Sequence, residues 1–357
     1  MANVDNFQLL IRRPGAVEIA PAPILRAPGP KDVRVRVARV TLCGSDYALF
    51  NGRYGGPGTY PIRFGHEWSG IVEEVGEEVD DLSPGDRVTG DCSKWCGTCP
   101  SCANDRNLCR HIGKFGITED GYAQQSLVAP RKYLYPDHHN LPLDLLALAE
   151  PFAVAMHAIR RVGTHGSDAH DRTVVIGAGA LGVALCLLLQ KCFGRRNVTL
   201  WETSPARRRL IRHRFRCAGV DVAAPSESVD RYTYNALYGG DSPRVVFDAS
   251  GSRSGFEIAL RIAGPRATVV LLGFPVEPVA EMRHISVKSL TVLGSIGGTG
   301  EFPQILEFLS IHRDFIEPMI TACYPYHDVE NAFSAGSNKD RHIKVQIDLS
   351  KEADSHG

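Results

Sequence analysis

The sequence has no excess of either charge, since 40 Lys and Arg residues balance 40 Asp and Glu residues. Proteins that bind DNA, RNA or anionic membranes usually carry a clear basic excess, so we expect none of these partners. A long apolar run is also lacking: the longest one, residues 174–189, is interrupted by glycines and is short for a bilayer span. Residues 1–15 show no basic segment followed by an apolar one, as a secretory signal would. We therefore expect a cytoplasmic protein.

Internal repeats and low-complexity tracts are absent as well. With 43% hydrophobic and 22% charged residues, the composition is typical of a globular protein. At roughly 150 residues per domain, a chain of 357 residues predicts two domains. Valine alternates with arginine over residues 33–40, and residues 84–86 (Pro-Gly-Asp) are typical of a turn. Short strands joined by such turns predict a compact domain of the β-barrel type in the first third of the chain.

Strands and helices alternate in the next part of the chain. Apolar strand patterns stand at 173–176, 198–201, 220–222, 245–248 and 268–272, with helical patterns from 180, over 205–216 and near 254–262. This order predicts a doubly wound parallel sheet. The alternating strand 343–349 again resembles the first third, so we expect the chain to return there. The expected limits are 1–155 for the first domain with a cysteine-rich lobe at 92–110, 156–289 for the sheet domain, 290–350 for the return and 351–357 for a tail.

A glycine-rich segment, VVIGAGALG, opens the second part. Gly177, Gly179 and Gly182 form G-x-G-x-x-G directly after an apolar strand and at the start of a helix that includes Ala180 and Leu181. Glycines at these places permit a tight turn and a close approach to a pyrophosphate, which the helix N-terminus attracts. A structural glycine turn is the alternative, but the strand–turn–helix setting favours a dinucleotide site.

An acidic residue, Glu202, ends the next strand. A carboxylate at this place binds the adenosine ribose hydroxyls and repels the extra phosphate of NADP. The run Arg207-Arg208-Arg209 that follows would instead favour NADP, because arginines there could bind its 2′-phosphate. We favour the simpler interpretation of a solvated helix face, although Arg207 stays a candidate for cofactor contact, and we therefore expect NAD rather than NADP.

Five of the ten cysteines crowd one short stretch. Cys96, Cys99, Cys102 and Cys109 have a spacing that closes a tetrahedral zinc site with no open position. Such a site stabilises a loop rather than taking part in catalysis. The alternative interpretation is that the four cysteines are free thiols that bind no metal. We interpret the fifth cysteine, Cys92, as a bystander, with replacement of one ligand as a second option.

Possible ligands for a second zinc are dispersed. Cys43 lies in CGSD, His66 and Glu67 lie in GHEWSG, and Glu150 lies in AEP. Taken singly, a His beside a Glu is more often a structural pair. Together they offer the mixed sulfur, nitrogen and oxygen set that holds a catalytic zinc with one position left for water or substrate. Pro151 disfavours helical geometry at Glu150, which would turn the side chain of Glu150 inward.

In this order, the motifs CGSD, GHEWSG, PGDRV, the four-cysteine lobe, AEP and GAGALG resemble those of the zinc-dependent medium-chain dehydrogenases. Within that family the chain is most similar to the branch of polyol, threonine and aminocyclitol (2-deoxy-scyllo-inosamine) dehydrogenases. The resemblance runs from about residue 33 to residue 346. It implies an α/β fold in which a GroES-like β-barrel-type catalytic domain carries an inserted Rossmann domain, with NAD(P) and substrate in the cleft between them.

The same resemblance implies roles for individual residues. Cys43, His66 and Glu150 correspond to the catalytic zinc ligands, and Glu67 to a neighbour that exchanges into coordination. The four lobe cysteines correspond to a structural zinc site, which makes two zinc ions per chain. Ser45 corresponds to the hydroxyl group that passes the alcohol proton outward. Many relatives continue CGSD-x-His, whereas this chain has Ala48 at that place, so proton exit needs water, the cofactor ribose or another base.

We therefore expect an oxidoreductase that converts a secondary alcohol of a polyol, sugar alcohol or aminocyclitol to a ketone, or the reverse, with zinc as Lewis acid. Threonine or a simple alcohol is the alternative substrate. A zinc-free quinone or enoyl reductase and a zinc-ribbon binding protein are remote alternatives, which the zinc motifs and the neutral charge oppose. The family also implies a homodimer or homotetramer.

Overall fold

The computed structural model describes residues 6–163, 170–225, 242–273 and 282–350. These residues form two compact units. The first unit draws on residues 1–150, 298–338 and 342–357, and the second on residues 151–297 and 339–341. The first unit is therefore built from both ends of the chain, and the second is inserted in it. Residues 151–155 and 290–297, which we expected in the catalytic domain, group with the second unit.

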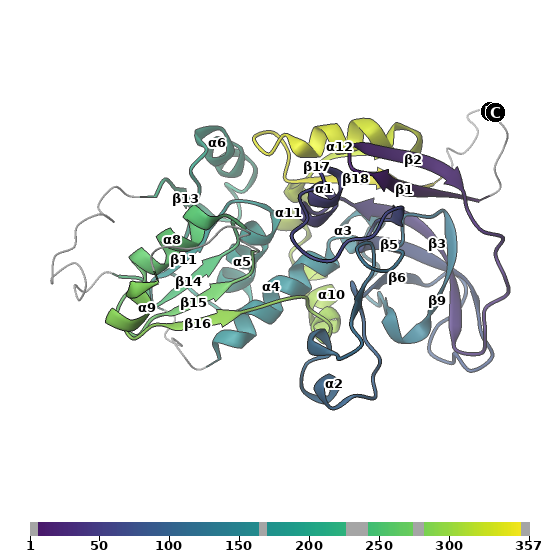
Figure 1. Cartoon of the computed structure of the whole chain (residues 1–357), viewed down its shortest axis with the longest axis horizontal. Helices are drawn as coiled ribbons and strands as arrows, with labels where there is room; N and C mark the ends of the chain where they lie inside the picture. The colour runs from purple at the N-terminus through teal and green to yellow at the C-terminus, as the bar shows by residue number, and fades with distance from the viewer. Residues whose placement is uncertain (1–5, 164–169, 226–241, 274–281, 351–357) are drawn as a thin grey trace. The chain divides into compact units, whose positions relative to one another are not determined.

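The second unit contains a six-stranded sheet in the order β13-β12-β11-β14-β15-β16 (Figure 1). The strands are β11 (Thr173–Ile176), β12 (Val198–Trp201), β13 (Asp221–Ala223), β14 (Val245–Asp248), β15 (Thr268–Leu271) and β16 (Thr291–Gly294). Every neighbouring pair is parallel. Helices α4 (Ala149–Val162), α5 (Ala180–Lys191), α6 (Pro205–Arg214), α8 (Arg253–Ile262) and α9 (Arg283–Val287) accompany the sheet. The predicted doubly wound parallel sheet is confirmed.

Two glycines set the packing at the start of α5. Gly177 has φ of +96°, and a Cβ added to it would lie 2.9 Å from the Cα of Ser250. A Cβ on Gly182 would lie 1.9 Å from the carbonyl oxygen of Gly177. The turn after β11 therefore tolerates no side chain at either place, as the dinucleotide motif requires.

The first unit contains a seven-stranded sheet in the order β10-β6-β5-β3-β18-β17, with β9 also paired to β3. Its strands are β3 (Asp32–Thr41), β5 (Glu67–Val75), β6 (Arg87–Gly90), β9 (Ser126–Pro130), β10 (Leu134–Pro136), β17 (Ile320–Pro325) and β18 (Lys344–Asp348). A second sheet joins β2 (Ala16–Pro21), β1 (Phe7–Arg13) and β4 (Ile62–Arg63), and β7 (Ser93–Lys94) pairs with β8 (Gly113–Lys114). The helices are α1 (Gly44–Phe50), α2 (Pro100–Asn104), α3 (Leu143–Leu146), α10 (Phe302–Ile311), α11 (Arg313–Ile316) and α12 (Val329–Ser337).

Segments from opposite ends of the chain lie side by side in this unit. The C-terminal strand β18 pairs antiparallel with β3. In Figure 1 the yellow helix α12 lies beside the dark purple strands β1 and β2, and its Phe333 packs edge-on against Phe64. The core therefore closes only when the C-terminal segment is in place.

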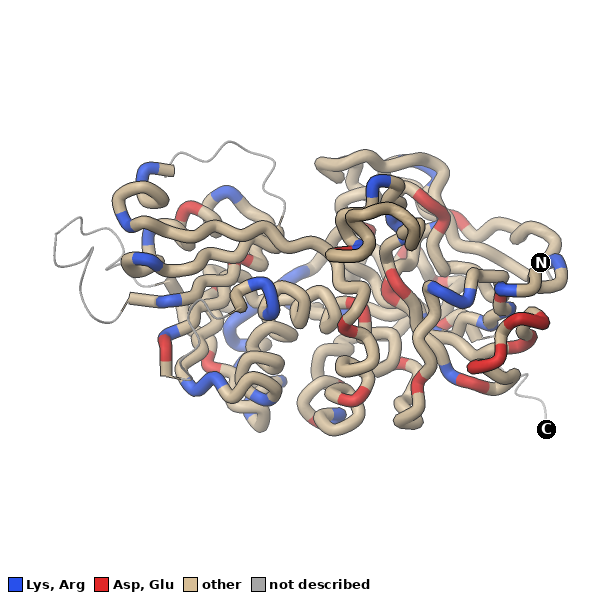
Figure 2. The backbone as a smooth tube through the Cα atoms, turned by 90° about the horizontal axis from the view of Figure 1, so that it is seen from below, with Lys and Arg blue, Asp and Glu red and all other residues tan. Residues whose placement is uncertain are grey.

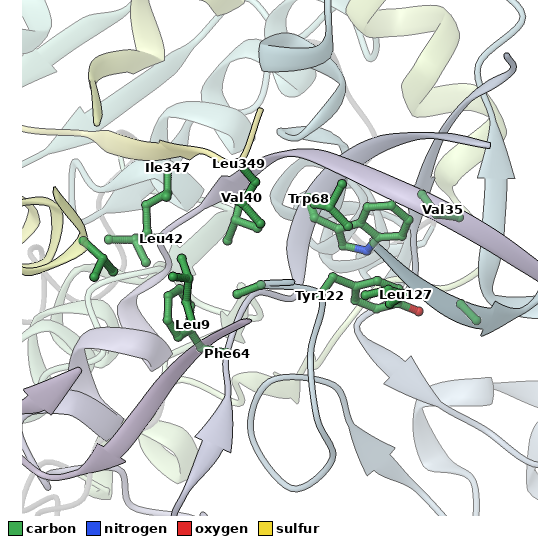
Figure 3. Packing of buried hydrophobic residues seen from close by; sticks show 14 of the residues in the cluster. Leu9, Val35, Val40, Leu42, Phe64, Trp68, Tyr122, Leu127, Ile347 and Leu349 are labelled. Carbon is green, nitrogen blue, oxygen red and sulfur yellow. The ribbon is translucent and has the colours of Figure 1, made fainter. Parts of the chain in front are cut away.

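Strand β3 has one buried and one charged face, as the alternating sequence predicts. Its valines are fully buried, while Arg34 pairs with Glu74 at 2.7 Å. On the buried side, Trp68 of β5 stacks on Tyr122 with ring centroids 4.2 Å apart (Figure 3). Trp68, the last residue of the GHEW motif, is thus a core residue.

The helical pattern around Pro151 behaves differently from our expectation. Glu150 lies in the first turn of α4, so the prediction of non-helical geometry there is wrong. Pro151 is the third residue of the helix, where the backbone N–H groups have no partner within the helix, and a proline is accommodated without loss.

Charge is distributed unevenly between the two units. Figure 2 shows acidic and basic positions in both, with basic ones prevailing in the unit that contains residues 151–297. Among the helices of the described residues, none is long and apolar enough to cross a bilayer.

Candidate active site

The first candidate metal site is formed where β3 ends and β5 begins. Thr41 and Glu67 are partners across these antiparallel strands, which places the segments after Thr41 and before Glu67 next to each other. The sulfur of Cys43, a ring nitrogen of His66 and a carboxylate oxygen of Glu67 lie within 4.8 Å of one another. A thiolate, an imidazole and a carboxylate gathered this closely are a donor set that fits zinc.

Helix α1 fixes the orientation of this site. Cys43 is its N-cap, and the Cys43 backbone N–H donates to Oδ2 of Asp46 at 2.8 Å. The other carboxylate oxygen of Asp46 faces Nδ1 of His66 at 3.7 Å, and both residues are buried. Asp46 was missed by sequence reasoning, although a carboxylate behind an imidazole is a common partner of a metal-binding histidine. On the opposite side of the ring, Ser45 Oγ lies 3.4 Å from His66 Nε2.

A buried ion pair adjoins the site. Lys344 Nζ donates to both carboxylate oxygens of Glu67, and the two residues are 3% and 0% exposed. Burial lowers the pKa of Lys344, but the negative charges of Glu67, Cys43 and Glu150 outweigh it, so that the net shift is upward. Sequence reasoning also missed Lys344, because only the pairing of β18 with β3 brings it to the site.

Glu150 lies near this group but outside it. The group of donor atoms within 4.8 Å, sought among the described residues, holds Cys43, His66 and Glu67 without Glu150. Burial raises the pKa of Glu150, while the charge of His66 lowers it. Cys92 is buried close to it: burial raises the pKa of the Cys92 thiol, and the charge of Glu150 raises it further. Cys92, which we interpreted as a bystander of the cysteine lobe, is therefore a neighbour of Glu150.

The four lobe cysteines form a second candidate metal site. Their sulfurs lie within 4.8 Å of one another, with separations of 3.5 Å for Cys99–Cys102 and 3.9 Å for Cys96–Cys102 and Cys99–Cys109. Four sulfurs bound to one zinc at about 2.3 Å would be about 3.8 Å apart, so these positions fit a tetrahedral zinc. All four cysteines are free of disulfide bonds.

Backbone donors already stabilise thiolates in this lobe. The sulfur of Cys109 accepts from the N–H groups of Cys96 and His111, each at 3.3 Å. Hydrogen bonds from the hydroxyl and N–H of Thr98 lower the pKa of Cys96 to about 5. A pocket of N–H donors around sulfur favours the deprotonated form that a metal needs.

The predicted nucleotide site lies in the second unit. Glu202 follows β12, and its carboxylate accepts from the N–H groups of Ala178 at 3.1 Å and Ser204 at 2.9 Å. It is therefore held against the glycine-rich turn, from which Ala180 and Leu181 begin α5.

The arginines after Glu202 are not all on a solvated face. Arg207 is 5% exposed and donates to the carbonyl oxygens of Ala178 and Lys339. Arg208 donates to the carbonyl oxygens of Glu202 and Thr203, and only Arg209 is exposed. The expectation of a solvated face is wrong for Arg207, because the carbonyl oxygens next to α6 bind its guanidinium.

Comparison with known proteins agrees with this geometry. Residues 29–140 match the alcohol dehydrogenase GroES-like domain, and residues 180–310 match the zinc-binding dehydrogenase family. A 2-dehydro-3-deoxy-L-galactonate 5-dehydrogenase of Pseudoalteromonas atlantica is 27% identical and covers 91% of this chain and 94% of its own. An L-threonine 3-dehydrogenase of Anaeromyxobacter is 29% identical, with 89% and 91% covered.

Two solved structures have a similar fold. A zinc-binding dehydrogenase of Sinorhizobium meliloti bound to NADP has a TM-score of 0.82 at 28% identity, covering 96% of this chain and 99% of its own. An alcohol dehydrogenase of Escherichia coli complexed with NADH has a TM-score of 0.82 at 26% identity, with the same shares covered. One relative is thus bound to NADP and the other to NADH.

The chain belongs to the zinc-type alcohol dehydrogenase family. It is an oxidoreductase of the NAD(P)-dependent alcohol dehydrogenase type, with a GroES-like unit and an inserted Rossmann unit. The zinc-binding dehydrogenase match agrees with the two groups of candidate zinc ligands.

The Lys344–Glu67 pair gives a testable prediction. Replacing Lys344 by Met should lower the free energy of unfolding by about 3–5 kcal/mol, because Glu67 is left as a buried unpaired charge. The double variant Lys344→Met/Glu67→Gln should recover most of this loss. Chemical denaturation of chelator-treated protein measures both, since zinc near Glu67 would otherwise supply the missing positive charge. A double variant no more stable than Lys344→Met would contradict this account.

Proposed function

We propose that the protein oxidises a secondary alcohol of a polyol, sugar alcohol or aminocyclitol to the ketone, or catalyses the reverse reaction, with NAD as the hydride acceptor. The observation that carries this proposal is the position of the Ser45 hydroxyl, 3.4 Å from a ring nitrogen of His66 in the Cys43–His66–Glu67 group. A hydroxyl beside a metal-binding nitrogen stands where an alcohol substrate would release its proton.

In this proposal Cys43, His66 and Glu150 hold the catalytic zinc, and Glu67 exchanges with a ligand. Zinc, when bound, supplies a Lewis acid for the alcohol oxygen, and NAD accepts the hydride. Asp46 holds the imidazole of His66 in orientation, and Lys344 compensates the charge of Glu67.

Ser45 is the first residue of the proposed proton path. Its hydroxyl takes the proton of the substrate alcohol and passes it outward. Ala48 offers no imidazole for the next step, so the proton leaves Ser45 through water or the cofactor ribose.

Support for NAD over NADP comes from the surroundings of Glu202. Its carboxylate is fixed at the glycine-rich turn, where it would accept from ribose hydroxyls and repel a 2′-phosphate. Arg207 and Arg208 are already bonded to carbonyl oxygens, which leaves them poorly placed to bind that phosphate.

Support for the substrate class comes from the relatives. One acts on a polyhydroxylated acid, by its name, and another on threonine, so threonine is the second candidate substrate. For the assembly, a homodimer or homotetramer is supported by β16, which is an edge strand of the Rossmann sheet and carries the partly exposed Val292.

The zinc content tests the ligand assignment. The wild-type protein should contain two zinc ions per chain, and Cys102→Ser should contain one, because three thiolates bind zinc far less tightly than four. The matched control is Cys217→Ser, an exposed cysteine of the second unit, which should keep two. Elemental analysis of the purified proteins provides the count, and equal zinc in Cys102→Ser and wild type would remove Cys102 from the site.

Ser45 has its own test. Ser45→Ala should reduce kcat by about 10²- to 10⁴-fold, the range of a lost proton-transfer group, while the Kd for NADH stays the same. Steady-state kinetics and NADH fluorescence measure the two quantities. Unchanged turnover would exclude Ser45 from the proton path.

A substrate panel tests the proposal as a whole. The zinc-loaded protein is offered polyols, sugar alcohols, aminocyclitols, threonine and simple alcohols, each with NAD and with NADP, and NAD(P)H formation is followed. We expect turnover of a cyclitol or sugar alcohol with NAD. Turnover of threonine alone would favour the second candidate, and turnover with NADP alone would overturn the cofactor assignment.

A further inference from the structure

A short C-terminal segment contacts the predicted nucleotide site. Residues 339–341 follow α12 of the first unit, yet they group with the second unit. The carbonyl oxygen of Lys339 accepts from the buried guanidinium of Arg207, which also donates to Ala178 in the glycine-rich turn. The segment is therefore fixed to the residues next to Glu202.

Asp340 has a specific partner in this region. Its Oδ1 accepts from the hydroxyl of Ser204 at 2.6 Å. Ser204 is the N-cap of α6, and its hydroxyl also accepts from the N–H of Arg207 at 3.2 Å. The hydroxyl of Ser204 thus donates one hydrogen bond and accepts another, and it holds the carboxylate of Asp340 at the start of the helix.

Two carboxylates consequently meet at one residue. The Ser204 backbone N–H donates to Glu202 at 2.9 Å, and the Ser204 side chain donates to Asp340. The guanidinium of Arg207 is close to both carboxylates. Burial lowers its pKa overall, and the charges of Glu202 and Asp340 offset part of this shift. The adenosine end of the site therefore carries two negative groups, one local to the motif and one from 138 residues further along the chain (340 − 202).

We propose that Asp340 is a second specificity-determining residue at the adenosine ribose, and that with Glu202 it excludes the 2′-phosphate of NADP. A carboxylate that faces the ribose from the Ser204 side repels a phosphate dianion but leaves the neutral 2′-hydroxyl of NAD unaffected. Glu202 alone then does not determine the choice of cofactor. This inference rests on the proposed nucleotide site.

Opposing charges surround Asp340. Lys339 and Arg341 are its exposed neighbours in the chain, and Arg209 is exposed on α6. Within the described part of the chain, the side chains of these three form no hydrogen bond or ion pair, whereas the side chain of Asp340 is fixed by Ser204. An immobilised charge acts on a ligand more strongly than a solvated one, so the carboxylate decides the local preference.

The test compares two adenosine nucleotides that differ only in the 2′-phosphate. Binding of 5′-AMP and of 2′,5′-ADP is measured by calorimetry for wild type, Asp340→Asn, Glu202→Gln and the double variant. Asparagine keeps an oxygen acceptor for Ser204, so Asp340→Asn removes the charge and preserves the hydrogen bond. Glu77→Gln, at an exposed position of the first unit, is the control with the same change in net charge.

We expect Asp340→Asn to bind 2′,5′-ADP about three- to tenfold more tightly than wild type, with 5′-AMP binding unchanged. Glu202→Gln should also gain affinity for 2′,5′-ADP, and the double variant should gain more than either. Glu77→Gln should match wild type. A gain in Glu202→Gln with none in Asp340→Asn would overturn the role of Asp340, as would an equal gain in Glu77→Gln. Failure of wild type to bind 5′-AMP and NADH would instead reject the proposed nucleotide site, and this inference with it.

Discussion

The antiparallel pairing of β18 with β3 is the constraint on which the catalytic unit depends. Strand β3 is central in the seven-stranded sheet and has β5 and β9 as further partners. Through β5 it sets the positions of His66 and Glu67, and its own end leads into Cys43. The addition of β18 brings Lys344 to the buried carboxylate of Glu67. The two pairings of β3, with β5 and with β18, therefore determine both the donors of the site and the charge that compensates them.

Electrostatic balance in the buried site follows from this arrangement. Cys43, Glu67, Glu150 and Asp46 bring several acidic groups into one region of low exposure, and Lys344 is the cation that meets them. Burial raises the pKa of two of these acids, Asp46 and Glu150. A dication suits such surroundings, because it favours the charged form of each donor.

The parts of the site that depend on local spacing could be predicted from the sequence, and those that depend on tertiary contacts could not. Four cysteines within fourteen positions (96–109) and a glycine motif between a strand and a helix show their chemistry in the sequence itself. Lys344 and Asp340 do not, since their partners lie 277 and 136 residues away in the chain. The burial of Arg207 was missed for a related reason: it lies in a run of three arginines, and the carbonyl groups that bind its guanidinium come from two other segments. At Glu150 the prediction failed because residues before proline usually avoid helical geometry, whereas the first turn of a helix accommodates a proline.

Because the catalytic unit is assembled from both ends of the chain, its completion is delayed during synthesis. The Rossmann strands are contiguous in sequence and emerge from the ribosome together, so this sheet forms while the first unit still lacks β18. Until about residue 348 has been translated, the Arg39–Thr41 end of β3 lacks the partner that β18 later provides, and unpaired edges attract other chains. Nascent protein of this architecture is thus most prone to aggregation late in translation, and premature termination after the Rossmann strands would release a folded nucleotide unit joined to an incomplete sheet.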